Sequence, residues 1–430
     1  MAERREQGER FTIGELGLDK RGGYVSGVMD VVDAVAGRVK GFHNPSGPTE
    51  SYRLEEDWGW RVVLWREPQM ISVAGFRAEW SLMEGALDGV GAELERVRQA
   101  VAVIVDDPGG GVYPPQLRLN PVGLRMVAQV LGDAVVLELH RGRPEAALED
   151  LVALIRLARQ HAGDPSWVVQ GIRVGLTELA VGGVWQLLQR EGWEGEQLVL
   201  LRDELMGLEL VSGFLRAAEV ERAIALEYAG ELERGGGGGA GVASSFSPSL
   251  HAWRMFGREE DLMYLLRSYE AFLVGAREFE SSGGRWRLGR GLVTGGAGEL
   301  ELGLGARWLG RLGFHYHYLV SGMIMPNLGR SAELLVSAET WRRMAVTWLE
   351  VEILQLERGA WPDGLAVLPG VDGEERWRVD PFSGESFQYR LREGKRPLLY
   401  SVGKDGVDRG GEAEESANQG DWVWPEPVGE

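Results

Sequence analysis

The sequence predicts a mainly α-helical protein, in which a bundle of helical hairpins is followed by a long helix that leads into a small C-terminal antiparallel β module. Three observations predict this class. Residues 119–232 repeat apolar side chains with a helical period and have short polar turns between the repeats. Residues 331–358 hold a helical pattern over one long stretch. Two strand-like runs joined by a polar turn follow after Gly359.

The clearest helix covers residues 143–159. Pro144 suits the first helical turn, and Glu145 and Glu149 place negative charge near the positive end of the helix dipole. Apolar residues then recur at spacings of three and four, namely Leu148, Leu151, Leu154, Ile155 and Ala158. This spacing indicates one buried helical face.

Further helices are predicted on both sides of this one. Their expected ranges are about 29–40, 79–105, 122–140, 165–190, 195–206, 211–232, 259–281, 306–325 and 331–358, and the expected strands are 387–391 and 398–402. Because the turns are short, consecutive helices must pack antiparallel. The hairpin over residues 122–162 resembles a tetratricopeptide unit. The later helices do not repeat at about 34 residues, so one such hairpin is expected rather than an array.

The chain divides into four expected segments. They are an irregular N-terminal segment with a short helix (1–70), a helical domain with a flexible loop at 235–249 (71–330), the long helix with the β module (331–411) and an acidic tail (412–430). The loop contains five consecutive glycines, Gly235 to Gly239, and could be mistaken for a phosphate-binding loop. The Lys-Ser/Thr pair that such a loop needs is missing, so a solvated linker is the preferred interpretation.

The composition limits the partners and the chemistry. The formal net charge is −19, which opposes the phosphate backbone, so nucleic acid is not an expected partner. The absence of cysteine excludes thiolate catalysis and cysteine-ligated metals. Residues 1–10 are charged, and no run reaches the roughly 18 apolar residues of a membrane helix. The chain as written is therefore expected to be soluble.

Glu219 and Glu221 are the candidate catalytic carboxylates, because they lie on one predicted helix and a carboxylate pair can perform acid–base chemistry. Arg222 lies three residues after Glu219, so a surface ion pair explains that carboxylate without catalysis. No histidine or nucleophile can be placed beside them, and the common hydrolase, metalloprotease and dinucleotide-binding motifs are absent from the sequence. The preferred expectation is that the chain has no catalytic residue.

Two places suggest metal binding. His315 and His317 are the closest pair of histidines, but residues two apart on a helix point in different directions, and their apolar neighbours indicate a packed segment. Asp405 and Asp408, with Glu412 nearby, lie in a glycine-rich loop whose oxygen ligands could hold calcium. Their spacing is not that of an EF-hand, and Asp-Gly is also common in turns. A calcium site and an ordinary turn both stay open here.

The C-terminal part of the chain contains an ordered series of short motifs. They are residues 357–365, Asp380-Pro381-Phe382-Ser383-Gly384, Tyr389-Arg390, residues 399–411 and Gly420-Asp421-Trp422. The series resembles the C-terminal module of type II secretion major pseudopilins, in which a long helix precedes an Asp-Pro turn, a small sheet and a Tyr-Ser-x-Gly-x-Asp-Gly loop. The resemblance implies that the loop with Asp405 and Asp408 binds calcium. The chain departs from these pseudopilins because it lacks their N-terminal hydrophobic helix.

A second resemblance covers more of the chain. It depends on residues 7–16, the helix over 142–159, the segment 217–223 and the same C-terminal motifs. Together they resemble a family of uncharacterised bacterial proteins, in which a membrane helix, a helical domain and a pseudopilin-like module follow one another. The resemblance implies association with the membrane of the cell envelope, with an anchor before Met1 in a longer form of the chain.

These observations predict a non-enzymatic scaffold or protein-interaction protein of the bacterial cell envelope, with a protein partner. Stacked helical hairpins offer extended grooves, and no assembled catalytic motif is visible in the sequence. The alternative is an enzyme whose carboxylate site is dispersed over the helical domain, with Glu219 or Glu221 as the leading residue. Ionisable groups that line a pocket would favour the enzyme, and a shallow groove with surface ion pairs would favour the scaffold.

Overall fold

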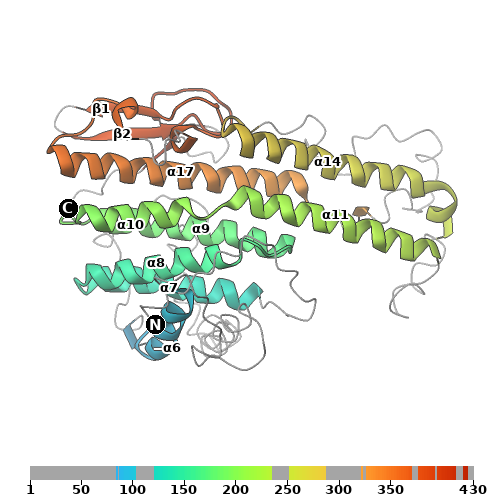
Figure 1. Cartoon of the computed structure of the whole chain (residues 1–430), viewed down its shortest axis with the longest axis horizontal. Coiled ribbons are helices and arrows are strands. Elements are labelled where there is room, and N and C mark those ends of the chain that lie inside the picture. Colours follow the sequence, from blue (N-terminus) through green and yellow to red (C-terminus); the bar gives the residue numbers. More distant parts are fainter. Residues whose placement is uncertain are drawn as a thin grey trace, which may run out of the picture. The chain divides into compact units, whose positions relative to one another are not determined.

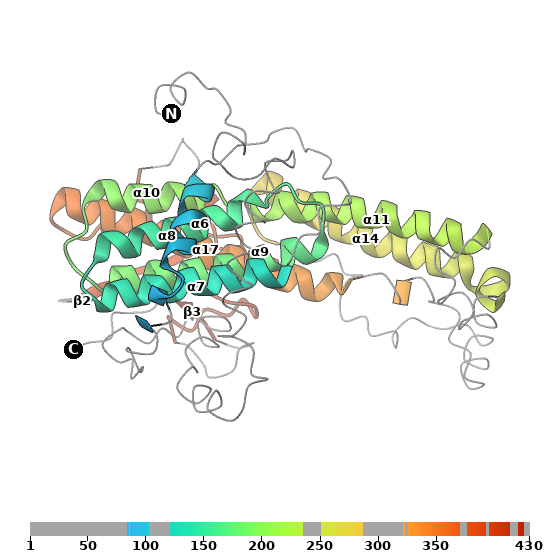
Figure 2. The same ribbon diagram turned by 90° about the horizontal axis from the view of Figure 1, so that it is seen from below.

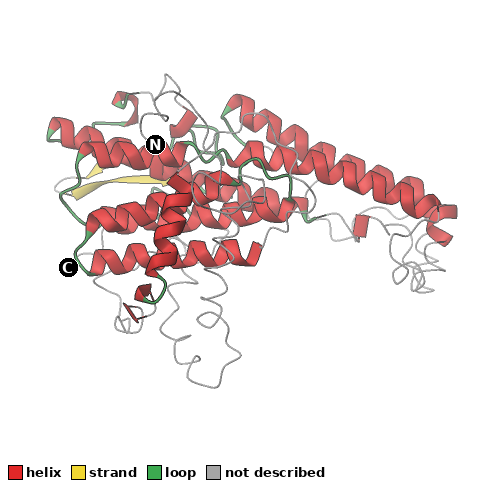
Figure 3. Cartoon of the chain, turned by 60° about the horizontal axis from the view of Figure 1, so that its bottom comes forward, coloured by secondary structure: helices red, strands yellow, loops and turns green. Residues whose placement is uncertain are grey.

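The computed structural model describes residues 84–85, 87–102, 121–234, 251–286, 321–322, 326–369, 376–392, 395–412 and 420–424. Over these residues the protein is mainly helical, and its strands are confined to a small antiparallel sheet near the C-terminus (Figure 3). This confirms the predicted fold class. The features predicted within residues 1–70, 235–249 and 306–320 lie outside the described part of the chain.

The chain forms two compact units, each assembled from separate stretches of sequence. Unit 1 contains the residues up to Gly163, Ile172–Leu210 and those from Ala338 onward, and unit 2 contains Asp164–Gly171 and Val211–Ser337. Three helices contribute residues to both units, namely α9 (Trp167–Leu188), α11 (Leu210–Arg234) and α17 (Leu328–Arg358). The four segments expected from the sequence are each a contiguous stretch of the chain. Their boundaries stay a prediction.

Unit 1 is layered (Figure 1). The sheet lies against α17, which lies against α10, and α8 and α7 follow on the other side. The helices that belong wholly to this unit are α6 (Gly91–Ala102), α7 (Pro121–His140), α8 (Pro144–Gln160) and α10 (Gly195–Met206). Their apolar faces join α17 and the sheet in one buried core that includes Leu151, Trp185 and Trp348. The five apolar residues predicted for the face of α8, from Leu148 to Ala158, are all buried, and so are most of the residues between them.

The prediction of one continuous helix over residues 79–105 is wrong. Residues 89–90 form a turn, and α6 begins only at Gly91. The N–H of Gly89 donates to the carbonyl of Gly85, and that of Val90 donates to the carbonyl of Leu87. Three glycines within seven residues, at 85, 89 and 91, weaken the helix here, because glycine loses more backbone freedom than other residues when it becomes helical.

Charged side chains connect neighbouring helices of unit 1. Asp150 on α8 is fully buried and accepts a hydrogen bond of 2.8 Å from Arg98 on α6. Burial raises the pKa of Asp150 to about 6, against the opposing effect of Arg98. Glu204 on α10 pairs with Arg156 on α8. The hairpin of α7 and α8 is thus held on both sides, although its likeness to a tetratricopeptide unit stays a prediction.

The sheet contains three antiparallel strands in the order β1-β2-β3. They are β1 (Gln388–Arg392), β2 (Lys395–Ser401) and β3 (Trp422–Val423). The first two were predicted, whereas β3 falls in the stretch assigned to an acidic tail. Trp424 after it is buried, and its N–H donates to the carbonyl of Leu399 at 2.8 Å. The buried indole of Trp424, together with the hydrogen bonds that the carboxylate of Asp421 accepts from the N–H groups of Arg409 and Gly411, explains why this segment is ordered.

A buried charge cluster on α17 joins the layers of unit 1. Arg342 and Arg343 both donate to the carboxylate of Glu339 at 2.8 Å, and all three side chains are almost completely buried. Burial by itself raises the pKa of Glu339, but the two guanidinium groups lower it to about 2. The carboxylate is therefore ionised throughout the physiological range of pH.

The same two arginines also bind backbone carbonyls of other elements. Arg342 donates to the carbonyl of Leu205 at 2.8 Å, at the C-terminal end of α10. Arg343 donates to the carbonyls of Arg376 and Val379 at 3.1 Å, in the segment that leads into the sheet. The cluster, defined as Glu339, Arg342 and Arg343, thus fixes α17 to both of its neighbours.

Glu350 lies further along α17 and has weaker partners. Its side chain is buried, and its Oε2 atom is 3.8 Å from Arg378 and has no hydrogen-bond partner among the described residues. Burial raises the pKa of Glu350 to about 7, although Arg378 and Arg202 oppose this rise. Burial without a close partner disfavours the ionised form of a carboxylate.

Unit 2 is built on α11 and α14 (Arg258–Ser282), which lie side by side (Figures 1 and 2) and carry the ion pairs Arg222–Glu270 and Arg258–Glu233. A single π-helical turn, η2 (Trp253–Gly257), precedes α14. The Nε1 atom of Trp253 donates to the buried Asp261 at 2.8 Å, and Ser321 donates to the same carboxylate. This hydrogen-bonded carboxylate fixes the start of α14.

None of the helices in the described part of the chain combines the length and the hydrophobicity needed to span a lipid bilayer.

We predict that Glu339→Gln lowers the free energy of unfolding at neutral pH by about 3 kcal/mol, because it leaves two buried guanidinium groups without their counter-charge. The pKa of Glu339 is lowered in the folded state, so its contribution is present above pH 4.5 and is lost as the pH falls towards 2. Urea unfolding at neutral pH measures the effect. An unchanged unfolding midpoint would show that the cluster does not hold the layers together.

We predict the opposite effect for Glu350→Gln. The folded-state pKa of Glu350 is raised, so the wild-type protein loses stability as the pH rises from 4.5 through about 7. The variant should be more stable than the wild type by about 1–3 kcal/mol near pH 8 and equal to it near pH 5. Urea unfolding at both values tests this, with Glu357→Gln, an exposed change on the same helix, as the control. A gain of the same size at both values would refute the proposed titration.

Candidate functional site

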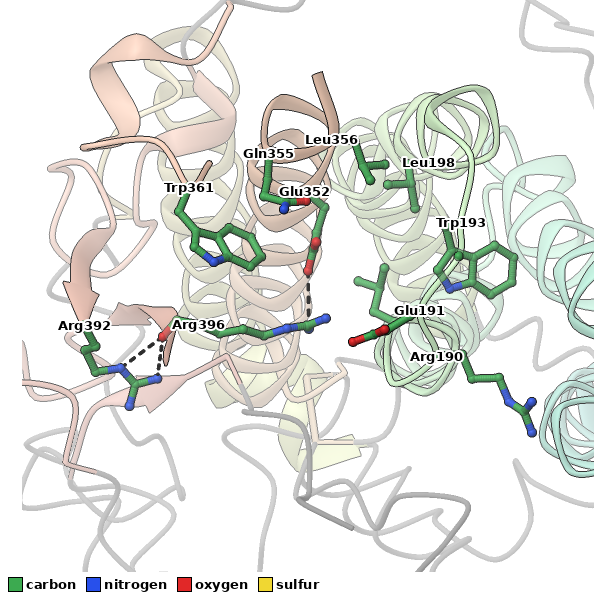
Figure 4. Close-up of a pocket in the computed structure, with 12 residues that line it drawn as sticks. Arg190, Glu191, Trp193, Leu198, Glu352, Gln355, Leu356, Trp361, Arg392 and Arg396 are labelled. Atoms are coloured by element: carbon green, nitrogen blue, oxygen red, sulfur yellow. Dashed lines mark hydrogen bonds and ion pairs between the residues drawn. The ribbon is translucent and has the colours of Figure 1, made fainter. Parts of the chain in front are cut away.

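A pocket in unit 1 opens where three separate segments of the chain meet. Its volume is about 640 Å³ (Figure 4). The segments are the turn between α9 and α10, the C-terminal end of α17 with the loop after it, and the hairpin of β1 and β2. The lining residues are Leu188, Arg190, Glu191, Gly192, Trp193, Leu198, Glu352, Gln355, Leu356, Trp361, Arg392 and Arg396.

A glycine with a positive φ lies shortly before each tryptophan of this pocket. Gly359 directly follows α17 with a φ of 69°, and its N–H donates to the carbonyl of Gln355 at 2.8 Å. This is the usual left-handed end of a helix, which glycine adopts without strain. The chain then reverses, and Trp361 lies on one side of the pocket (Figure 4). Gly192, with a φ of 95°, directly precedes Trp193 on the other side, in the turn between α9 and α10.

Both tryptophans are held by specific contacts. The Nε1 atom of Trp193 donates to the carbonyl of Leu187 at 2.8 Å. The ring of Trp361 lies 6.1 Å from that of Trp348, and the guanidinium of Arg396 lies 6.0 Å from its centroid. The pocket therefore has preorganised aromatic walls, which reduces the side-chain entropy that the protein loses when a ligand binds.

The arginines come from different segments. Arg396 reaches across the pocket and pairs with Glu352 at 3.3 Å (Figure 4). Arg392 donates to the backbone carbonyl of Arg396 at 3.0 and 3.2 Å. Arg190, which is exposed, donates to the carbonyl of Leu139 at the end of α7. Three arginines thus line one opening, and in Figure 4 the guanidinium group of Arg190 points away from it.

Glu352 is the buried acid of the pocket. It accepts a hydrogen bond of 3.0 Å from the Nε1 atom of Trp348 in addition to its ion pair with Arg396. Burial raises the pKa of Glu352, while Arg396 and Trp348 lower it in part. Among the described residues, the lining of the pocket contains no serine, threonine, tyrosine or histidine beside Glu352.

The two predicted catalytic carboxylates do not lie in this pocket, and they do not come together. Glu219 is exposed on α11 and forms an ion pair with Arg277. Glu221 is half-buried and accepts a hydrogen bond from the backbone N–H of Trp167, at the start of α9. Burial raises the pKa of Glu221, and this hydrogen bond lowers it in part. A surface ion pair and a helix cap account for the two residues.

Tyr269 is the notable neighbour of Glu221 in unit 2. It is fully buried, and its hydroxyl has no hydrogen-bond partner among the described residues. Burial raises the pKa of this tyrosine, and the nearby charge of Glu221 adds to the effect. The hydroxyl is therefore held in its neutral form.

The predicted calcium loop is folded by its own hydrogen bonds. Asp405 pairs with Arg409 at 2.8 Å and accepts the N–H of Val407. Asp408 accepts the hydroxyl of Tyr400 at 3.0 Å and the N–H of Gly410 at 2.8 Å. The two carboxylates thus bind different partners, and no group of three or more metal-ligating side chains occurs in the part of the chain that the structure describes. Calcium at Asp405 and Asp408 stays a prediction.

Sequence reasoning missed Asp421, a further acid that directly precedes β3 and binds this loop. Its Oδ2 atom accepts the N–H groups of Arg409 at 2.9 Å and Gly411 at 2.7 Å. Glu412 contributes its backbone carbonyl, which accepts the N–H of Asp421 at 3.1 Å. The motif that contains Asp421 was noted for its resemblance, but the pairing of β3 with β2 is what brings it beside the loop.

Other predicted sites lie elsewhere. His315 and His317, as well as Gly235 to Gly239, fall outside the described residues. The pocket itself was not predicted, because its residues come from three segments that no local spacing connects. The one local signal is that a glycine stands one or two residues before each of Trp193 and Trp361. No protein-family model, curated protein or solved structure matches this chain.

We predict that calcium binds the loop only weakly, with a Kd of about 0.1–1 mM, because Arg409 already neutralises Asp405. Isothermal titration of calcium into the chelator-treated chain measures the affinity. Asp408→Asn should abolish the heat, whereas Asp363→Asn, an exposed change outside the loop, should not. Absence of any heat at millimolar calcium would exclude a calcium site here.

Proposed function

We propose that this chain is a non-enzymatic scaffold or protein-interaction protein of the bacterial cell envelope, and that it binds its partner in the Trp193–Trp361 pocket. The composition of the pocket is the observation that carries this proposal. Tryptophan and arginine are the residues most enriched among those that dominate the binding energy of protein interfaces. Here two tryptophans and three arginines surround a single opening.

The exposed apolar surface of the pocket supports the same conclusion. Leu356, on the last turn of α17, has 48% of its surface exposed although it stands beside Trp361 and Leu198 in the lining. A large apolar side chain at the edge of an aromatic pocket gains free energy when a partner covers it, at about 25 cal/mol for each Å² removed from water. Apolar contacts framed by charged groups are the usual anatomy of an interface.

The contacts of the buried charged side chains favour a structural role for these residues over a catalytic role. The Glu339 cluster binds backbone carbonyls, and Asp150 connects two helices. The alternative function, an enzyme with a dispersed carboxylate site on the helical domain, has Glu221 beside Tyr269 as its best observation. That carboxylate caps α9, which explains its position without a reaction.

The assignment to the cell envelope is supported by the resemblance of the C-terminal motifs to those of type II secretion pseudopilins. The motifs lie on a long helix, a small antiparallel sheet and a glycine-rich loop, in the order that the resemblance implies. The pocket involves two of these three parts, since it contains the end of α17 and the β1–β2 hairpin. A partner in this pocket would therefore contact the module that carries the resemblance.

The test uses a photo-crosslinking amino acid placed at Leu356 in the full chain, expressed in its native host. We expect crosslinks to one protein from this position and none to that protein from Leu200, an exposed leucine on α10 outside the pocket. Trp361→Ala should remove the crosslink, because hot-spot tryptophans are each worth about 2 kcal/mol or more. Circular dichroism establishes that the variant is folded. Equal crosslinking from both positions, or none from Leu356, would reject the proposal.

A further inference from the structure

One side of the Trp193–Trp361 pocket holds an arginine of the chain between a tryptophan and a glutamate. The guanidinium of Arg396 lies 6.0 Å from the centroid of the Trp361 ring and 3.3 Å from the carboxylate of Glu352. A planar guanidinium can make both contacts at once, because its face stacks on an indole and its edge donates to a carboxylate. On this side, the protein supplies all three partners itself.

The same combination of side chains occurs a second time in unit 1. Arg342 lies 4.6 Å from the centroid of the Trp377 ring and pairs with Glu339 at 2.8 Å. In both places one indole and one carboxylate bind a single guanidinium. A tryptophan together with a glutamate is thus an arrangement with which this protein binds arginine side chains.

The opposite side of the pocket also has a tryptophan and a glutamate, Trp193 and Glu191. The carboxylate of Glu191 is directed into the pocket (Figure 4). Glu191 is exposed and forms no ion pair or hydrogen bond within the described part of the chain, where no cation and no second aromatic ring lies over Trp193 either. The indole is nevertheless fixed, because its Nε1 atom donates to the carbonyl of Leu187. These two side chains are therefore available to a ligand.

The arginines that line the pocket do not occupy this side. Arg396 is paired with Glu352, and the guanidinium of Arg190 points away from the pocket (Figure 4). Arg392 donates to the backbone carbonyl of Arg396 and lies beyond it, on the side of Trp361. The charged group that a ligand beside Trp193 meets is thus the carboxylate of Glu191.

The apolar residues near Trp193 suit the stem of an arginine side chain. Figure 4 shows Leu198 next to Trp193 and Leu356 beside Leu198. Arginine buries its methylene groups along such a surface while its charged end binds polar partners. A space of about 640 Å³ admits this side chain with its neighbours in a peptide. The net charge of −19 adds a long-range attraction for a basic partner.

We infer that the Trp193–Trp361 pocket binds a basic peptide segment of the partner, in which one arginine stacks on Trp193 and pairs with Glu191. This inference rests on the proposed function and specifies the chemistry of the partner. Arginine is selected over lysine, because a planar guanidinium can stack on the indole while it donates two N–H groups to the carboxylate. An acidic segment is disfavoured, because it brings a second carboxylate against Glu191.

The first experiment selects ligands without knowledge of the partner. A random dodecapeptide phage library is selected on the immobilised full chain, after depletion on the Glu191→Arg chain. We expect the enriched peptides to share an arginine, and to contain arginine more often than lysine. Enrichment of acidic or neutral peptides, or failure to enrich any sequence, would overturn the inference.

The second experiment measures the best enriched peptide by fluorescence anisotropy. Replacing its arginine by the neutral isostere citrulline should weaken binding about tenfold, and replacing it by lysine about three- to fivefold. Glu191→Gln should weaken binding of the original peptide about tenfold, because it removes the charge that pairs with the arginine. Equal affinity of the Glu191→Gln chain and the wild-type chain would contradict the inference.

A charge exchange separates recognition from damage to the fold. The peptide in which glutamate replaces the arginine should bind the Glu191→Arg chain about tenfold more tightly than it binds the wild-type chain. A disturbed fold cannot produce this gain. Glu357→Gln removes the same charge from an exposed position at the end of α17, outside the pocket lining, and should leave the affinity of the original peptide unchanged. The absence of a gain for the exchanged pair would refute the pairing with Glu191.

Crosslinking from Leu356 in the native host distinguishes the failure of this inference from the failure of the proposed function. We expect Glu191→Arg to remove the crosslink and Glu357→Arg to retain it. A Trp361-dependent crosslink that persists in the Glu191→Arg chain would reject the ligand class and keep the proposed function. The absence of a crosslink from the otherwise wild-type chain would reject both.

Discussion

The salt-bridged cluster of Glu339, Arg342 and Arg343 is the constraint on which the rest of unit 1 depends. One carboxylate holds two guanidinium groups inside the core, and their remaining donors bind carbonyls at the end of α10 and in the segment before the sheet. Such a cluster is tolerated in a low-dielectric interior only because nearly every donor has an acceptor. It fixes the depth and rotation of α17 between its two neighbours. The end of that helix therefore reaches the position where Trp361 can face the turn that carries Trp193.

Arginine side chains connect the elements of the core of unit 1, and other arginines line the pocket. Inside the core, arginine side chains end on carboxylates and backbone carbonyls of other elements, and they define which helix lies next to which. At the opening of the pocket, Arg190 and Arg392 also donate to backbone carbonyls. Arg396 belongs to both groups, because it pairs with the buried Glu352 and also lies over the ring of Trp361. The ion pair of Arg396 with Glu352 connects the β hairpin to α17 at the pocket.

Much of the fold could be predicted, and the site could not. The ends of α7, α8 and α10 follow from proline at helix starts, from the apolar period and from polar turns, all of which act within a few residues. The break at residues 89–90 and the third strand were missed, since the first depends on closely spaced glycines and the second on a pairing with β2. Glu219 and Glu221 looked like a pair because they are close in sequence. On a helix, residues two apart face different neighbours, and one meets Arg277 while the other caps α9.

The sequence by itself determined the class of this protein: its helical period, its late strands, its acidity and its lack of cysteine are local or summed properties that need no contacts. Only the tertiary structure decided which charges are buried, which tryptophans share an opening and which carboxylate faces an arginine. The physical reason is that hydrophobic periodicity specifies the buried face of each element but not the neighbour that covers it. The neighbours here are chosen by side chains such as Arg342, whose partners at Leu205 lie 137 residues away in the chain.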